Sequence, residues 1–247
     1  MAESASSRFA RLLTSLHIPE EHITEATAQV SAEEQAHAIE KWQMRAPDAL
    51  ECLQRVVVSS ASKMGETLSE HIIRSFEVSM MSLSQDTFDG EEWAAAFDAL
   101  AEHSMANFNT LHKYSTDISQ TPFPYPVLLE ELRPLLKRDF DVSPDDLTLS
   151  AAFFIHYGQS HNTILRRHRD NSHITVNVCL KVDSLQGSEI RFLRRSSETA
   201  PPVGESVLVE VPAGTALVHW GDQEHETLPW QAGDRWTAIL WFKLREA

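Results

Sequence analysis

Cysteine is nearly absent from this sequence, since only Cys52 and Cys179 occur among its 247 residues. Two thiols cannot build a disulfide framework, and they are too few for a zinc finger or ribbon made of several thiolates. No apolar stretch approaches the roughly 18 residues that a membrane-spanning helix needs. The N-terminus also lacks the basic and apolar regions of a signal peptide. We therefore expect a cytoplasmic protein that does not insert into a membrane.

Positive charge is scarce as well, because 21 Lys and Arg residues stand against 36 Asp and Glu residues, for a net charge of −15. Proteins that bind nucleic acids need a basic surface to meet the phosphates, so this balance argues against such a partner. The apolar and charged fractions, 42% and 23%, are typical of a folded globular protein. The length predicts one large domain or two modest ones.

The first half of the chain is poor in glycine and has the apolar spacing of amphipathic helices, as in Phe9, Leu12 and Leu16. Ser31 followed by Glu34 has the pattern of a helix-capping box. Further helices are predicted around Leu68–Phe76, over Asp89–Asn109 and, after alternating prolines that no helix tolerates, over Val127–Lys137.

After that last predicted helix, the spacing of apolar residues changes from the pattern of helices to the pattern of strands. Six short segments rich in Val, Ile, Phe and Trp are bounded by Gly, Pro or Asp and are predicted to be strands: Leu149–Tyr157, His173–Val182, Glu189–Arg194, Ser206–Val211, Thr215–His219 and Trp236–Lys243. Many short strands with turn signals indicate a sandwich or barrel. The predicted fold class is α+β, with a helical N-terminal region over residues 1–120 and a jelly roll, or double-stranded β-helix, over residues 121–247.

Three features of the second half can act together chemically. His168 and Asp170 are two residues apart, so an extended backbone presents them on the same face. His225 and then Arg235 follow near the last predicted strand. Two histidines and one carboxylate are the ligands that hold non-haem Fe(II) while leaving positions open. A guanidinium nearby can hold the carboxylate of a keto acid by two hydrogen bonds.

The sequence around these residues resembles the Fe(II)- and 2-oxoglutarate-dependent dioxygenase superfamily, and within it the prolyl and lysyl hydroxylases. The resemblance covers about residues 145–245 and is carried by four stretches: His168-Arg-Asp170-Asn-Ser-His-Ile-Thr175-Val-Asn-Val, Gly187-Ser-Glu-Ile-Arg-Phe192, Val211-Pro-Ala-Gly214, and His225-Glu-Thr-Leu-Pro229 followed by Gly233-Asp-Arg235-Trp. Gly187-Ser188 replaces the usual Gly-Gly, and Arg235 stands where many prolyl hydroxylases have Lys.

The resemblance implies that His168, Asp170 and His225 bind Fe(II). It implies that Arg235 holds the far carboxylate of the cosubstrate 2-oxoglutarate, assisted by Tyr157, Thr175 and Thr227. O2 would be consumed, 2-oxoglutarate would be decarboxylated to succinate, and a C–H bond would be hydroxylated, with ascorbate as an optional reductant. The implied substrate is a peptidyl proline or lysine, or a small amino-acid-like molecule.

Several alternatives stay open at this point. His219 is a rival third metal ligand, although Pro229, Gly233 and Arg235 have the family spacing only from His225. The chain could be a catalytically silent binding protein that acts through its acidic helices. In an active enzyme, these helices could instead form a lid or a homodimer interface. A nucleic-acid demethylase of the same superfamily would need a second arginine in the last strand.

Arginines gather around the His168 motif, at positions 166, 167 and 169, and around 191, 194 and 195. They have two interpretations: a rim that attracts an acidic substrate, or charges that keep strand edges from sticking to other chains.

Overall fold

The computed structural model describes residues 3–16, 18, 20–44, 48–58, 73–85, 88–103, 115–158, 164–193 and 206–245. The chain forms two compact units. One contains Met1–Phe76 and Phe192–Leu208, and the other contains Glu77–Arg191 and Val209–Ala247. Within these described stretches, no helix combines the length and the apolar character needed to cross a membrane.

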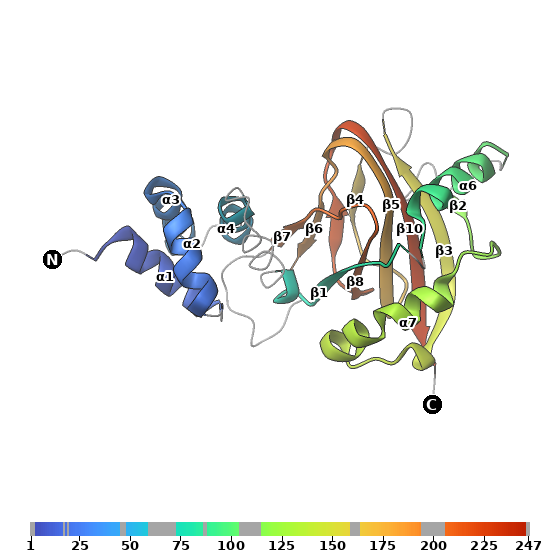
Figure 1. Ribbon diagram of the computed structural model, residues 1–247, viewed down its shortest axis with the longest axis horizontal. Coiled ribbons are helices and arrows are strands. Elements are labelled where there is room, and N and C mark those ends of the chain that lie inside the picture. Colours follow the sequence, from blue (N-terminus) through green and yellow to red (C-terminus); the bar gives the residue numbers. More distant parts are fainter. Residues whose placement is uncertain are drawn as a thin grey trace. The chain divides into compact units, whose positions relative to one another are not determined.

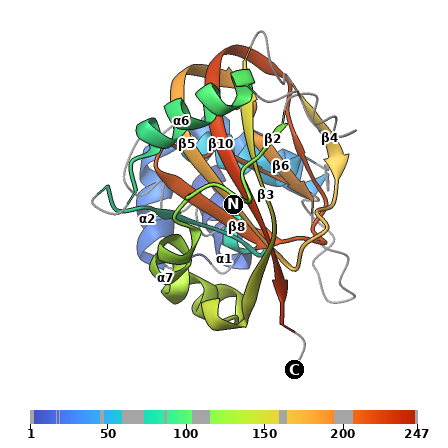
Figure 2. The same ribbon diagram turned by 90° about the vertical axis from the view of Figure 1, so that its right-hand side faces the viewer.

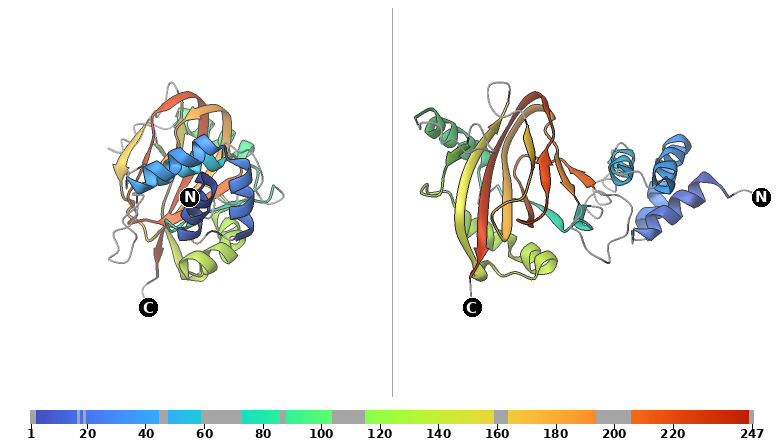
Figure 3. Two further views of the ribbon diagram at one scale, coloured as in Figure 1. Left: turned by 90° about the vertical axis from the view of Figure 1, so that its left-hand side faces the viewer. Right: turned by 180° about the vertical axis from the view of Figure 1, so that it is seen from behind.

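The described residues of the first unit form helices α1 (Ala5–Ser15), α2 (Glu20–Gln29), α3 (Ala32–Gln43) and α4 (Ala49–Val58). Helix α1 contacts both α2 and α3, and α3 contacts α4 (Figure 3). The predicted capping box is confirmed, because Ser31 and Glu34 exchange side-chain and backbone hydrogen bonds at the start of α3. Phe9 and Leu13, spaced for a helix, are fully buried.

Strand β7 (Ser206–Val209) is contacted by helix α4 through Gln54. The Gln54 Oε1 atom accepts a hydrogen bond from the Leu208 N–H at 3.0 Å, and its Nε2 donates to the Leu208 carbonyl at 2.8 Å. The side-chain amide therefore pairs with the strand backbone as a neighbouring strand would.

The second unit is built on a six-stranded sheet in which every neighbouring pair is antiparallel. The strand order is β1 (Val78–Ser82), β8 (Thr215–Trp220), β5 (Ile174–Gly187), β10 (Trp230–Leu244), β3 (Leu147–Tyr157) and β2 (Ser115–Asp117). A four-stranded sheet has the order β4 (Leu165–His168), β9 (His225–Thr227), β6 (Ile190–Leu193) and β7. Strands β4, β6 and β7 are labelled in Figure 1.

Helices α6 (Gly90–His103) and α7 (Tyr125–Leu135) lie on the outer face of the larger sheet (Figure 2). A single wide turn, Leu136–Phe140, extends α7, and a short 3-10 turn, Pro144–Asp146, leads into β3. The two faces of the sheet differ because side chains alternate along a strand. On β5, Val176 and Val178 belong to the apolar core that these helices cover, whereas Thr175 and Asn177 line a cavity on the inner face.

The six predicted strands are confirmed, with β10 starting earlier, at Trp230, than predicted. Helix α6 confirms the predicted helix from Asp89 as far as His103, and residues 104–110 lie outside the described part of the chain. Residues 68–72 of the helix predicted around Leu68–Phe76 also lie outside the described part of the chain. Strands β1 and β2 lie within residues 1–120, for which only helices are predicted. Both strands and helix α6 belong to the second unit. The domain boundary after residue 120 stays a prediction.

We expect Phe97 to be the main anchor of α6. Its ring is 2% exposed and lies 5.3 Å from that of Phe154 on β3 and 5.6 Å from that of Phe123, measured between centroids. Replacing it with Ala should lower the free energy of unfolding by about 3–5 kcal/mol, whereas Phe97→Leu should cost less because it leaves a smaller cavity. Urea denaturation measures both. A loss under about 1 kcal/mol for Phe97→Ala would contradict this packing.

Candidate metal centre

The pairing of β4 with β9 sets two histidines side by side. His168, the last residue of β4, is directly opposite His225, the first residue of β9. The centroids of the two rings are 4.3 Å apart. Both strands are short, and the register of their pairing shifts between Leu165 and His168. The position of His168 opposite His225 therefore depends on the pairing at these two residues and not on a long regular ladder.

Asp170 reaches the same place from the loop that follows β4. Its backbone N–H donates to the Gly221 carbonyl at 2.8 Å, and its Oδ2 accepts a 2.7 Å hydrogen bond from the Thr175 hydroxyl. A Cβ atom on Gly221 would lie 2.2 Å from the Ser172 carbonyl oxygen. The close approach of the two loops therefore requires glycine at position 221.

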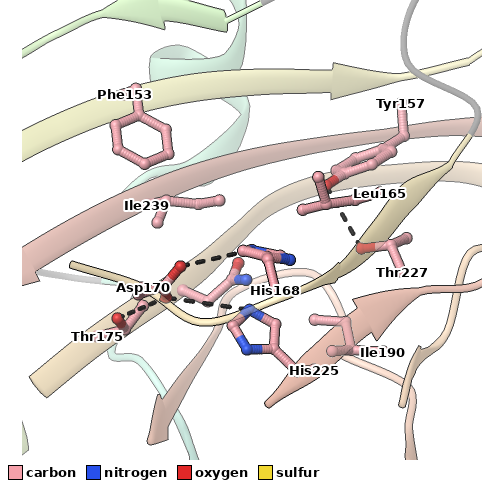
Figure 4. Close-up of a pocket in the computed structure, with 11 residues that line it drawn as sticks. Phe153, Tyr157, Leu165, His168, Asp170, Thr175, Ile190, His225, Thr227 and Ile239 are labelled. Carbon is pink, nitrogen blue, oxygen red and sulfur yellow. Dashed lines mark hydrogen bonds and ion pairs between the residues drawn. The ribbon is translucent and has the colours of Figure 1, made fainter. Parts of the chain in front are cut away.

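The three side chains converge, with ligand atoms that all lie within 4.8 Å of one another. The Nε2 of His168 is 3.5 Å from Asp170 Oδ1, and the Nε2 of His225 is 3.9 Å from Oδ2 (Figure 4). Each histidine Nδ1 lies near a backbone carbonyl, at 2.8 Å from Arg166 O and 2.9 Å from Gln223 O. These contacts put the proton of a neutral ring on Nδ1 and aim the Nε2 lone pair at the centre.

Burial and the charges of the neighbouring groups shift the pKa values of the three cluster side chains in different directions. Burial alone would raise the pKa of Asp170, but the hydrogen bond with His168 and the neighbouring imidazoles hold that pKa below its usual range. Burial lowers the pKa of His225 to about 3, and His219 adds to the effect. Burial also acts to lower the pKa of His168, but its interaction with Asp170 outweighs this and raises it. A carboxylate and an unprotonated His225 are thus available as ligands at neutral pH.

The cavity in front of this cluster measures about 10 Å³, which is room for one water-sized group. Both sheets contribute to its walls (Figure 4). Its apolar lining consists of Phe153, Leu165, Ile190 and Ile239, and its other lining residues besides the cluster are Tyr157, Thr175, Asn177 and Thr227. The Tyr157 hydroxyl lies 3.5 Å from the Thr227 hydroxyl.

Arg235 is buried behind Tyr157, with its guanidinium carbon 4.5 Å from the centroid of that ring. One terminal nitrogen donates to the Ser188 carbonyl at 2.7 Å. Within the described part of the chain, the Nε of Arg235 and the hydroxyls of Ser188 and Thr237 are buried and have no hydrogen-bond partner. Arg235 and Ser188 also line a larger cavity of about 490 Å³. Unpaired buried donors of this kind are rare and suit an anionic ligand.

His219, the rival ligand, lies next to the cluster. It is 1% exposed on β8, and its Nε2 is 3.8 Å from Asp170 Oδ2, almost the distance of His225. Its Nδ1 lies 2.8 Å from the Trp220 carbonyl, and its ring is 4.7 Å from that of His225. Among the described residues, however, the group that could hold a metal contains His225 and not His219.

All seven residues singled out from the sequence lie in this region. Thr175 contacts Asp170, Tyr157 and Thr227 line the cavity, and Arg235 packs on Tyr157. Asn177, Ser188 and Thr237 are not among the site residues predicted from the sequence, although Ser188 belongs to the Gly187-Ser188 pair of the motif. Asn177 and Thr237 could have been found by counting two residues from Thr175 and from Arg235 along their strands. Ser188 carries no such signal, because its position depends on a turn with a positive φ of 68°.

No family model matches this chain. It is similar to curated proteins named 2-oxoglutarate and iron-dependent oxygenase domain-containing protein 2, from Xenopus tropicalis (29% identical over 142 residues) and Danio rerio (26% over 208 residues). These alignments cover 55% and 80% of this chain but 40% and 59% of the relatives, so the chain spans about half their length. A further relative, 2-oxoglutarate and iron-dependent oxygenase domain-containing protein CP2 of Arabidopsis thaliana, is 30% identical over 144 residues, which is 54% of this chain and 36% of that protein.

Solved structures with a similar fold include a Pseudomonas putida prolyl-4-hydroxylase, with a TM-score of 0.51, 19% identity, and coverage of 70% of this chain and 96% of that one. AviO1 from Streptomyces viridochromogenes Tue57 has a TM-score of 0.50 at 17% identity, covering 69% and 90%. At such identities the likeness concerns the fold. Together, the comparisons confirm the resemblance to 2-oxoglutarate and iron-dependent oxygenases that the motifs indicate.

We expect His225→Ala to abolish measurable Mn²⁺ binding, because it removes one of the three converging ligand atoms. His219→Ala should weaken binding by about tenfold, as expected for a neighbour that orients a ligand. Electron paramagnetic resonance of the free Mn²⁺ ion measures both affinities without turnover. Lost binding in His219→Ala with retained binding in His225→Ala would reverse the assignment.

The metal-free protein should lose stability as the pH falls below about 6.5. Folding lowers the pKa of His225 and of His219, so the unfolded chain takes up these protons first and acid favours it. The pKa of His168 is raised, so the stability that its protonation contributes is already complete below the unfolded pKa of about 6.5 and does not offset this loss. The two lowered pKa values together give a dependence of at most about 2.7 kcal/mol per pH unit.

Thermal unfolding of the metal-free protein between pH 7 and 5 measures this dependence. His225→Gln removes one of the two groups responsible and should flatten the curve. A melting temperature that does not change over this range in the wild type would contradict the buried, unprotonated state of these histidines.

Proposed function

We propose that this chain is an Fe(II)- and 2-oxoglutarate-dependent dioxygenase that hydroxylates a C–H bond and converts 2-oxoglutarate to succinate. The observation that carries the proposal is the buried cluster of His168, Asp170 and His225 facing a cavity, with the buried guanidinium of Arg235 nearby. The similar proteins are named 2-oxoglutarate and iron-dependent oxygenase domain-containing proteins, which supports the proposal.

The proposed fold of strands β3 to β10 is a jelly roll. Two strand orders support it: β8-β5-β10-β3 within the larger sheet and β4-β9-β6-β7 in the smaller one. Strands β3, β4, β5 and β6 thus alternate between the two sheets. This agrees with a jelly roll, which is built from two Greek keys.

The cluster fits Fe(II) by the chemistry of its donors. Two imidazole nitrogens and one carboxylate oxygen match the preference of non-haem Fe(II), and the described site contains no thiolate that would favour zinc. In this proposal His168, Asp170 and His225 hold the metal. Backbone carbonyls fix both imidazoles, and Thr175 fixes the carboxylate.

The surroundings of Arg235 fit the far carboxylate of 2-oxoglutarate. The guanidinium is buried, its Nε has no partner in the described chain, and the hydroxyls of Ser188 and Thr237 are also unpaired. Charge-assisted hydrogen bonds to these donors would offset the desolvation of a carboxylate. The Tyr157 ring contacts the guanidinium, 4.5 Å from the ring centroid to the guanidinium carbon, and restricts its position.

The bound iron, with 2-oxoglutarate and O2, supplies the oxidising power for the hydroxylation. The protein side chains do the rest. Asp170 stays ionised and His225 stays unprotonated, so both remain available as ligands at neutral pH. Phe153, Ile190 and Ile239 form apolar walls that keep bulk water from the reacting group. Arg235 orients the cosubstrate through one fixed end.

The proposed substrate is a peptidyl proline or lysine side chain, or a small amino-acid-like molecule. The motif resemblance supports this choice, and the similarity in fold to a prolyl-4-hydroxylase agrees with it. Because a fold alone does not set the substrate, the loops around the cavity are proposed to select it.

Asp170→Ala should abolish succinate formation from 2-oxoglutarate, because it removes the only carboxylate of the described metal cluster. Arg235→Ala should raise the KM for 2-oxoglutarate by at least about tenfold with a smaller change in kcat, since it removes a buried charge-assisted contact. Arg133→Ala, an exposed arginine on α7, is the matched control and should behave as the wild type.

Succinate release, measured by mass spectrometry with Fe(II) and O2 present, follows all three variants. Unchanged succinate formation by Asp170→Ala would overturn the proposed function. Absence of succinate from the wild-type protein with every substrate class would favour a binding protein that retains the barrel.

A further inference from the structure

In the part of the chain that the structure describes, the guanidinium groups of two exposed arginines beside the candidate metal centre have no partner. Arg166 lies on β4 and Arg169 follows it, so they flank His168 on both sides. Every other Lys or Arg described in the second unit, apart from the buried Arg235, has an acidic or hydrogen-bonding side-chain partner. In a chain with a net charge of −15, unpaired cations at one place are unexpected.

The nearby carboxylate is already engaged by other arginines. Glu226 on β9 lies 3.1 Å from Arg191 and 3.5 Å from Arg167, measured from its Oε1 to a guanidinium nitrogen. Among the described residues, Glu226 therefore pairs with Arg167 and Arg191, and no acidic side chain pairs with Arg166 or Arg169. Ile164, beside them, is an apolar side chain that is 50% exposed.

We propose that Arg166 and Arg169 recognise carboxylate side chains of an acidic peptide whose target residue enters the cavity. This proposal rests on the proposed function and names its substrate class. Leu165 and His168 line the cavity, whereas Arg166 and Arg169 are exposed outside it. A ligand that contacts both regions at once has to extend from the cavity to its rim, which suits a polypeptide better than a small metabolite.

An alternative explanation is that these charges protect an open strand edge. In the described residues β4 is the end strand of its sheet, and charge on an end strand discourages aggregation. The two explanations can be separated, because glutamate would protect the edge as well as arginine does but would repel an acidic peptide.

The test uses the full chain and three fluorescein-labelled peptides with a central proline, flanked on each side by four Glu, four Gly or four Lys residues. Fluorescence anisotropy at low salt measures binding. The glutamate peptide should bind the wild type at least about tenfold more tightly than the glycine peptide. The double variant Arg166→Glu/Arg169→Glu should lose this difference and show no preference for the glutamate peptide.

The matched control is Arg133→Glu/Lys137→Glu on and beside α7, which changes the net charge by the same amount at exposed sites. It should keep the preference of the wild type. Equal binding of the glutamate peptide by the Arg166→Glu/Arg169→Glu variant and the wild type would overturn the proposal, as would equal binding of the glutamate and glycine peptides by the wild type.

Asp170→Ala separates the two proposals, since it should keep peptide binding while losing succinate formation. If the proposed function fails, the wild type forms no succinate but still selects the glutamate peptide. If the peptide surface fails, succinate forms and no charge preference is measured.

Discussion

The hydrogen bond from the Asp170 N–H to the Gly221 carbonyl joins the loop after β4 to the loop after β8. It brings the carboxylate between the two sheets, where His168 and His225 already lie side by side. Gly221 permits this approach because no Cβ fits against Ser172. Without this contact the loop backbone would lose its anchor, and the carboxylate would be positioned mainly by the hydrogen bond from the Thr175 hydroxyl.

The same arrangement explains why the site sits on a rigid support. Strands β5 and β10 present apolar side chains to α6 and α7 and polar ones to the cavity, so one alternating pattern builds both the core and the site. Thr175 and Arg235 are therefore positioned by the packing of their strand neighbours. A ligand group held this way loses little freedom on binding, which favours a defined geometry.

Much of this could be predicted from the sequence. The long strands were found because they carry enough β-branched and aromatic residues to set a period, and the spacing of Pro229, Gly233 and Arg235 pointed to His225 rather than His219. Strands β4 and β9 have four and three residues, too few for a period, and were missed. Strand β1 was missed because Val78–Ser82 contains mostly Ser and Met. Unpaired hydroxyls, such as that of Thr237, depend on tertiary neighbours and leave no local signal.

The central claim is that His168, Asp170 and His225 hold Fe(II) within reach of a keto acid whose far end Arg235 binds. The most direct measurement is an anaerobic titration of the metal-free protein with Fe(II) and then 2-oxoglutarate, followed by visible absorption. The account predicts a charge-transfer band of the chelated keto acid in the wild type that is lost in His225→Ala and weakened in Arg235→Ala. No band in the wild type, or an undiminished band in His225→Ala, would contradict it.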